Sequence, residues 1–239
     1  MNRIARALAA LVCAAPGVAA AQSYQCNIPE RIAPPHAEGP TQGQPRRVLP
    51  IGGYTLAISW SPQQCAHRSD ISSSFQCDPE NRFGFTLHGL WPDGKRENQW
   101  PQYCKAAPVL PQTVIRRHIC TTPSAQLLQH EYAKHGTCTG MTPTTYFATS
   151  ARLFGNLRYP DMAALSRKRD LTAGQLARAI AAANPGITTR MMRLTADKRG
   201  WLEEVWLCLD TRLRYRACPA FEKSLPDDQP IRIRRPADR

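Results

Sequence analysis

The nine cysteines of this 239-residue chain constrain its fold more than any other feature of the sequence. Cys13 lies within the first 21 residues, which have the pattern of an export signal, and removal of that segment leaves eight. An even number of cysteines in an exported protein indicates disulfide bonds. The sequence contains no C-x-x-C pair, which argues against a structural zinc site. We therefore expect a fold stabilised by disulfides, although eight cysteines can pair in many ways.

Residues 1–21 are typical of a bacterial signal peptide. Arg3 and Arg6 form a basic start, an apolar segment covers 7–15, and three alanines precede Gln22 as a cleavage site. A short N-terminal helix is the alternative. The pattern predicts export, to the periplasm or to the medium. No other segment approaches the roughly 18 apolar residues of a membrane-spanning helix, so we expect no stable membrane insertion.

The charge of the chain is strongly basic. Its formal net charge of +13 falls only by the two charges of Arg3 and Arg6 if the signal is removed. Such an excess favours polyanionic partners, either nucleic acid or an anionic membrane surface. It is a weak indication on its own, because many proteins are basic.

Local patterns predict one α+β domain flanked by two irregular segments. The proline-rich residues 22–50 read as an extended leader, residues 51–225 as the domain, and residues 226–239 as a loose basic tail. Within the domain, alternation and turn signals predict strands and a hairpin, while capping residues and apolar stripes predict helices. The expected strands are 54–60, 82–90, 188–195 and 201–210, and the expected helices are 123–136, 142–157 and 172–183. These strands and helices interleave irregularly, which favours an α+β fold.

The segment 128–138, LQHEYAKHGTC, carries the most chemistry. On a helix Glu131 and His135 lie four residues apart on one face, with Lys134 beside them and His130 at the edge. An acid, a base and a cation therefore share one patch, unless the segment is only a charged, solvated helix face. His130 and His135 are five residues apart, about 140° round an ideal helix. We therefore expect that they do not bind one metal ion.

The segment 85–93, FTLHGLWPD, is the second candidate. His88 falls at the end of a predicted strand, Gly89 allows the chain to turn, and the stiff Pro92 holds Trp91. A nucleobase can stack on such a ring. The alternative is a core tryptophan beside a surface histidine.

Together the two segments supply a general acid, a general base and groups that stabilise negative charge. These groups suit cleavage of RNA by its own 2′-hydroxyl. One histidine would remove the 2′-proton and the other would protonate the departing 5′-oxygen. This chemistry requires no external nucleophile, metal or cofactor.

Both segments closely resemble the active-site segments of the ribonuclease T2 family of secreted endoribonucleases. Weaker similarity extends from ISWSPQQC at 58–65 to WLCLDTRLRYRAC at 206–218. The resemblance implies an α+β fold, a single domain with a central, mainly antiparallel sheet packed by helices. It also implies metal-independent cleavage of single-stranded RNA, through a 2′,3′-cyclic phosphate to 3′-phosphate ends.

The resemblance further implies roles for individual residues. His135 would be the base, His88 the acid, and His130 a phosphate-binding group. Glu131 and Lys134 would stabilise the pentacoordinate phosphorus. The base upstream of the cut would be held by Trp91 and Asp93, and a second stacking aromatic has two candidates, Trp100 and Tyr103.

The same resemblance implies a disulfide pairing. Three pairs resemble those of the family: Cys65–Cys77, Cys104–Cys138 and Cys208–Cys218. Cys26 and Cys120 are then paired by elimination. The Cys104–Cys138 bond would hold the helix bearing Glu131 near the strand bearing His88.

Two other functions compete with the endoribonuclease. One is a catalytically idle relative that binds RNA, a membrane or another protein, and RNA degradation would distinguish it. The other is a metallohydrolase, which a chelator would inhibit. We expect a monomer that needs no cofactor, while base preference and biological role are left open.

Overall fold

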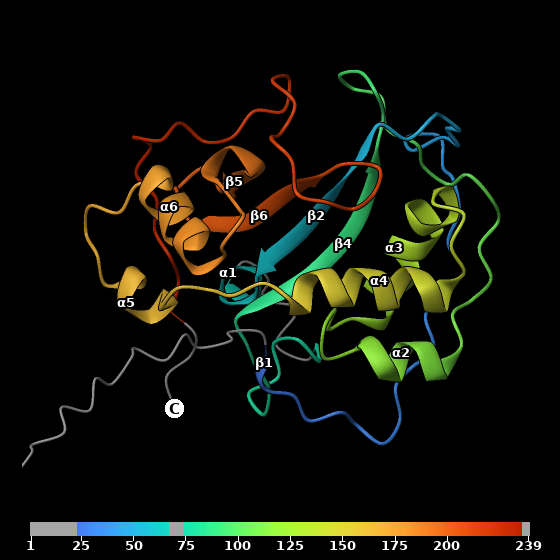
Figure 1. Cartoon of the computed structure of the whole chain (residues 1–239). Helices are drawn as coiled ribbons and strands as arrows, with labels where there is room; N and C mark the ends of the chain where they lie inside the picture. Colours follow the sequence, from blue (N-terminus) through green and yellow to red (C-terminus); the bar gives the residue numbers. More distant parts are fainter. Residues whose placement is uncertain (1–22, 67–73, 236–239) are drawn as a thin grey trace, which may run out of the picture.

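The structure is a computed structural model that describes residues 23–66 and 74–235. The predicted signal peptide lies outside the described residues. Figure 1 shows one sheet at the centre of the folded domain, with helices on both sides of it. None of the helices in the described ranges is long and apolar enough to cross a membrane.

The central sheet has four antiparallel strands in the order β4-β2-β6-β5. Its strands are β2 (Gly53–Trp60), β4 (Phe85–Asp93), β5 (Met192–Ala196) and β6 (Leu202–Leu209). A two-stranded sheet pairs β1 (Ser23–Gln25) with β3 (Arg82–Phe83). The expected α+β fold with a mainly antiparallel sheet is therefore confirmed. The predicted strand 82–90 is interrupted at Gly84 and extends further, to Asp93.

Helices pack at both sides of this sheet. Beside β4 lie α3 and α4, with α2 packed on α4, whereas α6 packs against β5 (Figure 1). The helices are α1 (Ser61–Ala66), α2 (Gln112–His118), α3 (Ala125–Lys134), α4 (Pro143–Gly155), α5 (Met162–Ser166) and α6 (Ala173–Ala183). Short 3-10 turns cover Gly136–Cys138 and Thr189–Met191.

Side-chain alternation gives the sheet one apolar face and one polar face. Leu56 and Ile58 of β2 and Val205 of β6 belong to the core. Thr55 and Ser59 lie on the opposite face, with Glu204 across from Ser59. The polar face is the one on which the histidine of β4 is found.

Helix capping follows the sequence. Thr172 and Gln175 form both bonds of a capping box at the start of α6, as predicted. Thr142 caps α4, with Pro143 at its first position. Helix α3 begins later than predicted, because the Ser124 side chain caps it and Pro123 lies outside.

Four disulfides tie these elements together, and their pairing is the one expected from the sequence. They are Cys26–Cys120, Cys65–Cys77, Cys104–Cys138 and Cys208–Cys218. Cys104–Cys138 joins the loop after β4 to the turn after α3. The backbone N–H of Tyr103 also donates to the Lys134 carbonyl at 2.8 Å, so the carboxyl end of α3 is fixed beside that loop.

The C-terminal segment is not a loose tail, and that prediction was wrong for residues 226–235. The side chains of Ile231 and Ile233 are only 2% and 3% exposed and belong to the core. The N–H of Ile231 donates to the Leu171 carbonyl, and the N–H of Leu202 donates to the Arg232 carbonyl. The isoleucines alternate with arginines, so one side of the segment is buried while the other bears the charge.

The leader forms no helix or named strand between Cys26 and Pro50, and it is attached to the domain. Strand β1 pairs with β3, and Cys26 bonds to Cys120. Further along, the N–H of His36 donates to the side chain of Gln126 on α3 at 2.9 Å. The leader therefore crosses α3, the helix of the candidate site.

Candidate active site

A β-bulge presents His88 on the polar face of the sheet. In the ladder between β2 and β4, Ala57 pairs with Gly89 and Ile58 pairs with Leu87, which leaves His88 as the extra residue. Bulges redirect side chains and are frequent beside active sites. Leu87 on one side of the bulge and Leu90 on the other both remain in the core.

A carboxylate on β6 holds the His88 ring. Nδ1 of His88 lies 2.6 Å from Oε1 of Glu204, and Nε2 lies 3.5 Å from Oε1 of Glu131. Burial lowers the pKa of His88, but the hydrogen bond to Glu204 and the charge of Glu131 outweigh it, so the pKa is raised. Burial raises the pKa of Glu204, yet its hydrogen bonds from His88, Ser59 and Trp206 leave it lowered. This pair favours an imidazolium beside a carboxylate.

Glu131 is buried where α3 meets β4. Its Oε2 accepts a hydrogen bond of 2.8 Å from Nε1 of Trp91. A Cβ added at Gly89 would lie 1.7 Å from that oxygen, so glycine is needed there for the carboxylate to approach the strand. Burial raises the pKa of Glu131, although His88, His130 and Trp91 act in the opposite direction.

His135 is placed in the opposite electrostatic situation. It follows the last residue of α3 with φ −106° and is buried. Burial and the nearby cation of Lys134 hold the pKa of His135 well below its usual value. Its Nδ1 atom is buried and has no hydrogen-bond partner within the described residues. The ring is therefore favoured in its neutral form.

Trp91 lies at the centre of this cluster rather than at its rim. Its ring is stacked against His135 with centroids 5.5 Å apart, and it meets His88 edge-on at 5.0 Å. The Trp206 ring contacts it edge-on at 5.1 Å. Because Trp91 also donates to Glu131, it fixes the positions of three of the predicted site residues.

The leader reaches the site at His130. A carboxylate oxygen of Glu38 contacts Nδ1 of His130, and the Tyr103 hydroxyl donates to the same oxygen at 3.0 Å. Tyr103 is only 3% exposed, so it offers no stacking surface, and that candidate was wrong. Trp100 is 40% exposed and stays a candidate for the second stacking aromatic.

A cavity of about 550 Å³ opens over the cluster. The predicted site residues all line it: His88, Trp91, Asp93, His130, Glu131, Lys134 and His135. Trp100 lies at the same cavity. Burial raises the pKa of Asp93 to about 7, even though the Thr55 hydroxyl donates to it at 2.8 Å. The structure thus brings both sequence segments into one concave site.

The sequence and the fold were compared with known proteins. Residues 51–218 match the Ribonuclease T2 family.

This chain belongs to the ribonuclease T2 family.

A probable ribonuclease of Haemophilus influenzae is 29% identical over 180 residues, which cover 71% of this chain and 61% of that protein. Ribonuclease I of Escherichia coli is 30% identical over 139 residues, which cover 42% of this chain and 52% of that protein. The chain thus spans about three fifths or less of the length of these relatives. Among solved structures, RNase NT in complex with 5′-AMP superposes with a TM-score of 0.63, at 21% identity, over 79% of this chain and all of that one.

In this T2 family member, the sequence did not reveal the residues that β6 contributes. Glu204 and Trp206 face the site, and Nε1 of Trp206 donates to Oε2 of Glu204 at 2.6 Å. The guanidinium of Arg193 lies over the Trp206 ring at 4.8 Å. Alternation within WLEEVWLCL does place these two side chains on one face, which is the signal that was available.

The premise that His130 and His135 lie too far apart around the helix for their donor atoms to meet was wrong. His130, Glu131 and His135 have donor atoms that all lie within 4.8 Å of one another. His135 caps α3 with φ −106°, and its backbone N–H still donates to the Glu131 carbonyl. Two imidazoles and a carboxylate are ligands that zinc accepts, and a chelator is therefore a necessary control in any assay.

Proposed function

We propose that this protein is an exported endoribonuclease that cleaves single-stranded RNA without a metal ion. It acts as a monomer through attack of the 2′-hydroxyl, giving a 2′,3′-cyclic phosphate and then a 3′-phosphate. Membership of the ribonuclease T2 family supports ribonuclease activity in general. The four disulfides support an oxidising destination.

The opposite electrostatic environments of two histidines support the mechanism most strongly. His88 is paired with Glu204, which favours a proton on the ring, whereas His135 is buried beside Lys134, which disfavours one. A general acid must start protonated and a general base must start neutral. The geometry therefore supports His88 as acid and His135 as base.

In the first step, His135 removes the proton of the 2′-hydroxyl while the 2′-oxygen bonds to phosphorus. The bond from phosphorus to the 5′-oxygen breaks, and that oxygen takes a proton from Nε2 of His88, because Nδ1 is bonded to Glu204. His130, Lys134 and Glu131 line the same cavity, where they would stabilise the charged phosphorane. The nucleophile belongs to the substrate, so its proximity to phosphorus needs no further group.

In the second step, water opens the cyclic phosphate and the two histidines exchange roles. His88, now neutral, takes a proton from water, and His135 returns one to the 2′-oxygen. The product carries a 3′-phosphate and a free 2′-hydroxyl. Both histidines then regain their starting states.

Trp91 and Asp93 would hold the base upstream of the cut, with Trp100 as the second aromatic. All three line the site cavity. Since one side of Trp91 is occupied by His135, a base would stack only on the part of the ring that faces the cavity. Base–aromatic stacking contributes about 1–3 kcal/mol per base.

Digestion of RNA homopolymers in EDTA, with analysis of the products over time, tests this proposal. We expect a cyclic phosphate first and a 3′-phosphate later, with DNA left intact because it lacks the nucleophile. Replacing His88 or His135 by Ala should reduce the rate by at least about 10²-fold. The exposed His36 provides a matched control, and His36→Ala should keep full activity. Cleavage of DNA, a 5′-phosphate product, or inhibition by EDTA would overturn the mechanism, and folded wild-type protein that leaves RNA intact would favour an idle relative.

A further inference from the structure

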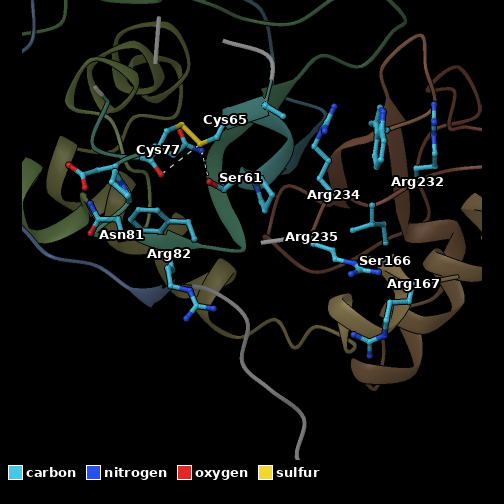
Figure 2. Close-up of a pocket in the computed structure, with 18 of the residues that line it drawn as sticks. Ser61, Cys65, Cys77, Asn81, Arg82, Ser166, Arg167, Arg232, Arg234 and Arg235 are labelled. Carbon is cyan, nitrogen blue, oxygen red and sulfur yellow. Dashed lines mark hydrogen bonds between the residues drawn. A yellow bond between two sulfur atoms is a disulfide. The ribbon is translucent and has the colours of Figure 1, made fainter. Parts of the chain in front are cut away.

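A second cavity, of about 900 Å³, lies away from the candidate active site and shares no lining residue with it. Basic side chains line it from three separate segments of the chain, and Figure 2 labels arginines from each of them. The arginines are Arg82 of β3, Arg167 and Arg169 after α5, and Arg232, Arg234 and Arg235 of the C-terminal segment. We call this the arginine cavity.

Two of these arginines are held in place by an aromatic ring. The guanidinium carbons of Arg232 and Arg234 lie 4.6 Å and 4.4 Å from the centre of the Trp201 ring. Nε of Arg234 also donates to Oε1 of Gln63 at 2.6 Å, and Arg232 donates to the carbonyl of Arg199. A guanidinium has five N–H donors, so stacking and one bond orient each group without using up its hydrogen-bonding capacity.

The cavity has a large excess of positive charge. Within the described residues, none of its arginines forms an ion pair with a carboxylate. Asp78 is the acidic residue that lines it in that same part of the chain. Clustered guanidinium groups without carboxylate partners suit a ligand with several phosphates, because each can bind two phosphate oxygens.

The shape of the site favours a nucleic acid strand over a membrane. A planar bilayer surface cannot enter a cavity of this volume, whereas a flexible single strand can follow it. The cavity and the active site both border β6: Trp206 lines the site, and Trp201 lies just before the strand begins. At about 3.3 Å per residue, these two tryptophans are roughly 17 Å apart along the chain. About five nucleotides span that distance at the 3.4 Å rise of a helical strand.

We propose that the arginine cavity is a second RNA-binding site, which holds backbone phosphates several nucleotides away from the bond that is cut. The proposal rests on the proposed function, since the strand it binds is the substrate. Phosphate contacts of this kind are independent of sequence and increase affinity for long strands. A dinucleotide would occupy only the active site.

A triple charge-reversal variant, Arg167→Glu, Arg169→Glu and Arg235→Glu, tests the proposal with residues that are exposed and outside the core. The matched control reverses three exposed arginines that line neither cavity, with Arg117→Glu, Arg158→Glu and Arg212→Glu. Binding is measured by fluorescence anisotropy with a 20-nucleotide 2′-O-methyl RNA, which has no free 2′-hydroxyl. Cleavage is measured separately on a 20-nucleotide RNA and on a dinucleotide.

We expect the cavity variant to bind the 20-mer at least tenfold more weakly than the control does, with unchanged cleavage of the dinucleotide. Its salt dependence should be shallower, by about 0.7 in the log–log slope for each phosphate that the protein no longer binds. Equal losses of affinity in both variants would overturn the proposal, since net charge would then explain them. A reduced affinity for phosphatidylserine vesicles with unchanged 20-mer binding would also overturn it. Because binding is measured without cleavage, a protein that fails to cut RNA leaves this test intact.

Discussion

Replacing Glu204 by Gln should change the pH dependence of cleavage rather than abolish cleavage. The carboxylate contacts Nδ1 of His88 at 2.6 Å and is a main cause of the raised pKa of that histidine. Glutamine keeps the size of the side chain and an acceptor oxygen but removes the charge. An opposite charge this close favours the charged form of a histidine. We expect the pKa of His88 to fall without it, although the charge of Glu131 still raises that pKa.

The sign of the effect on activity follows from the role of each histidine. In the proposed mechanism the acid must be protonated, so the alkaline limb of the pH–rate profile would belong to His88 and the acidic limb to His135. A lower pKa of His88 moves the alkaline limb to lower pH. At pH values above both the original and the lowered pKa of His88, the rate should fall by about 10–100-fold, because a hydrogen bond to a charged group contributes about 1.5–3 kcal/mol. At pH values below the shifted pKa, the loss should largely disappear.

The assay is kcat/KM on a dinucleotide between pH 4 and pH 9, together with a thermal melt of each variant. Ser59→Ala is the matched control, because the Ser59 hydroxyl donates to the same oxygen of Glu204 at 2.6 Å and carries no charge. This control should leave the alkaline limb where it is. If Glu204→Gln reduces the rate equally at every pH, or leaves the alkaline limb unmoved, the assignment of His88 as acid through Glu204 is refuted.

Three further predictions concern the architecture around the site. Gly89→Ala should reduce kcat by at least about 10²-fold, because its Cβ would lie 1.7 Å from Oε2 of Glu131. Adding Glu131→Ala to this variant should restore part of the lost melting temperature. If the two substitutions instead lower Tm additively, the clash is not the cause. Replacing both Cys104 and Cys138 by Ala should lower the free energy of unfolding in urea by about 4 kcal/mol for a 34-residue separation, and a loss below about 1 kcal/mol would show that the bond constrains little. Truncation after residue 225 should cost about 3–6 kcal/mol from Ile231 and Ile233 alone, so unchanged urea unfolding would contradict their place in the core.

The sequence was sufficient where the chemistry lies in consecutive residues. FTLHGLWPD and HEYAKHGTC each occupy one short stretch, so their spacing could be read directly. Caps and turns are equally local, which is why the capping box of α6 and the β5–β6 hairpin were found. The bulge at His88 was not foreseen, because it depends on the partner strand β2.

Contacts between distant segments account for what was missed. Glu204 is 116 residues from His88 in the sequence. The two side chains meet because β4 and β6 both flank β2, and because the bulge in β4 turns His88 to the same face of the sheet as Glu204. Glu38 reaches His130 from a part of the leader that forms neither helix nor strand, so no periodic pattern predicted the contact. The alternation Ile-Arg-Ile-Arg at 231–234 did signal a half-buried extended segment, but its basic composition suggested a tail instead. The closeness of the His130 and His135 donor atoms was missed because angles around a helix describe where side chains start and not where two long side chains end.

The most direct test of the central claim is an NMR titration of the imidazole signals of His88 and His135 in the free protein, assigned with His88→Ala and His135→Ala. The pairing with Glu204 predicts that His88 titrates above its ordinary value. Burial beside Lys134 predicts that His135 titrates well below it, so that between the two values one ring is charged and the other neutral. The reverse order, with His135 taking up its proton at higher pH than His88, would contradict the assignment of acid and base.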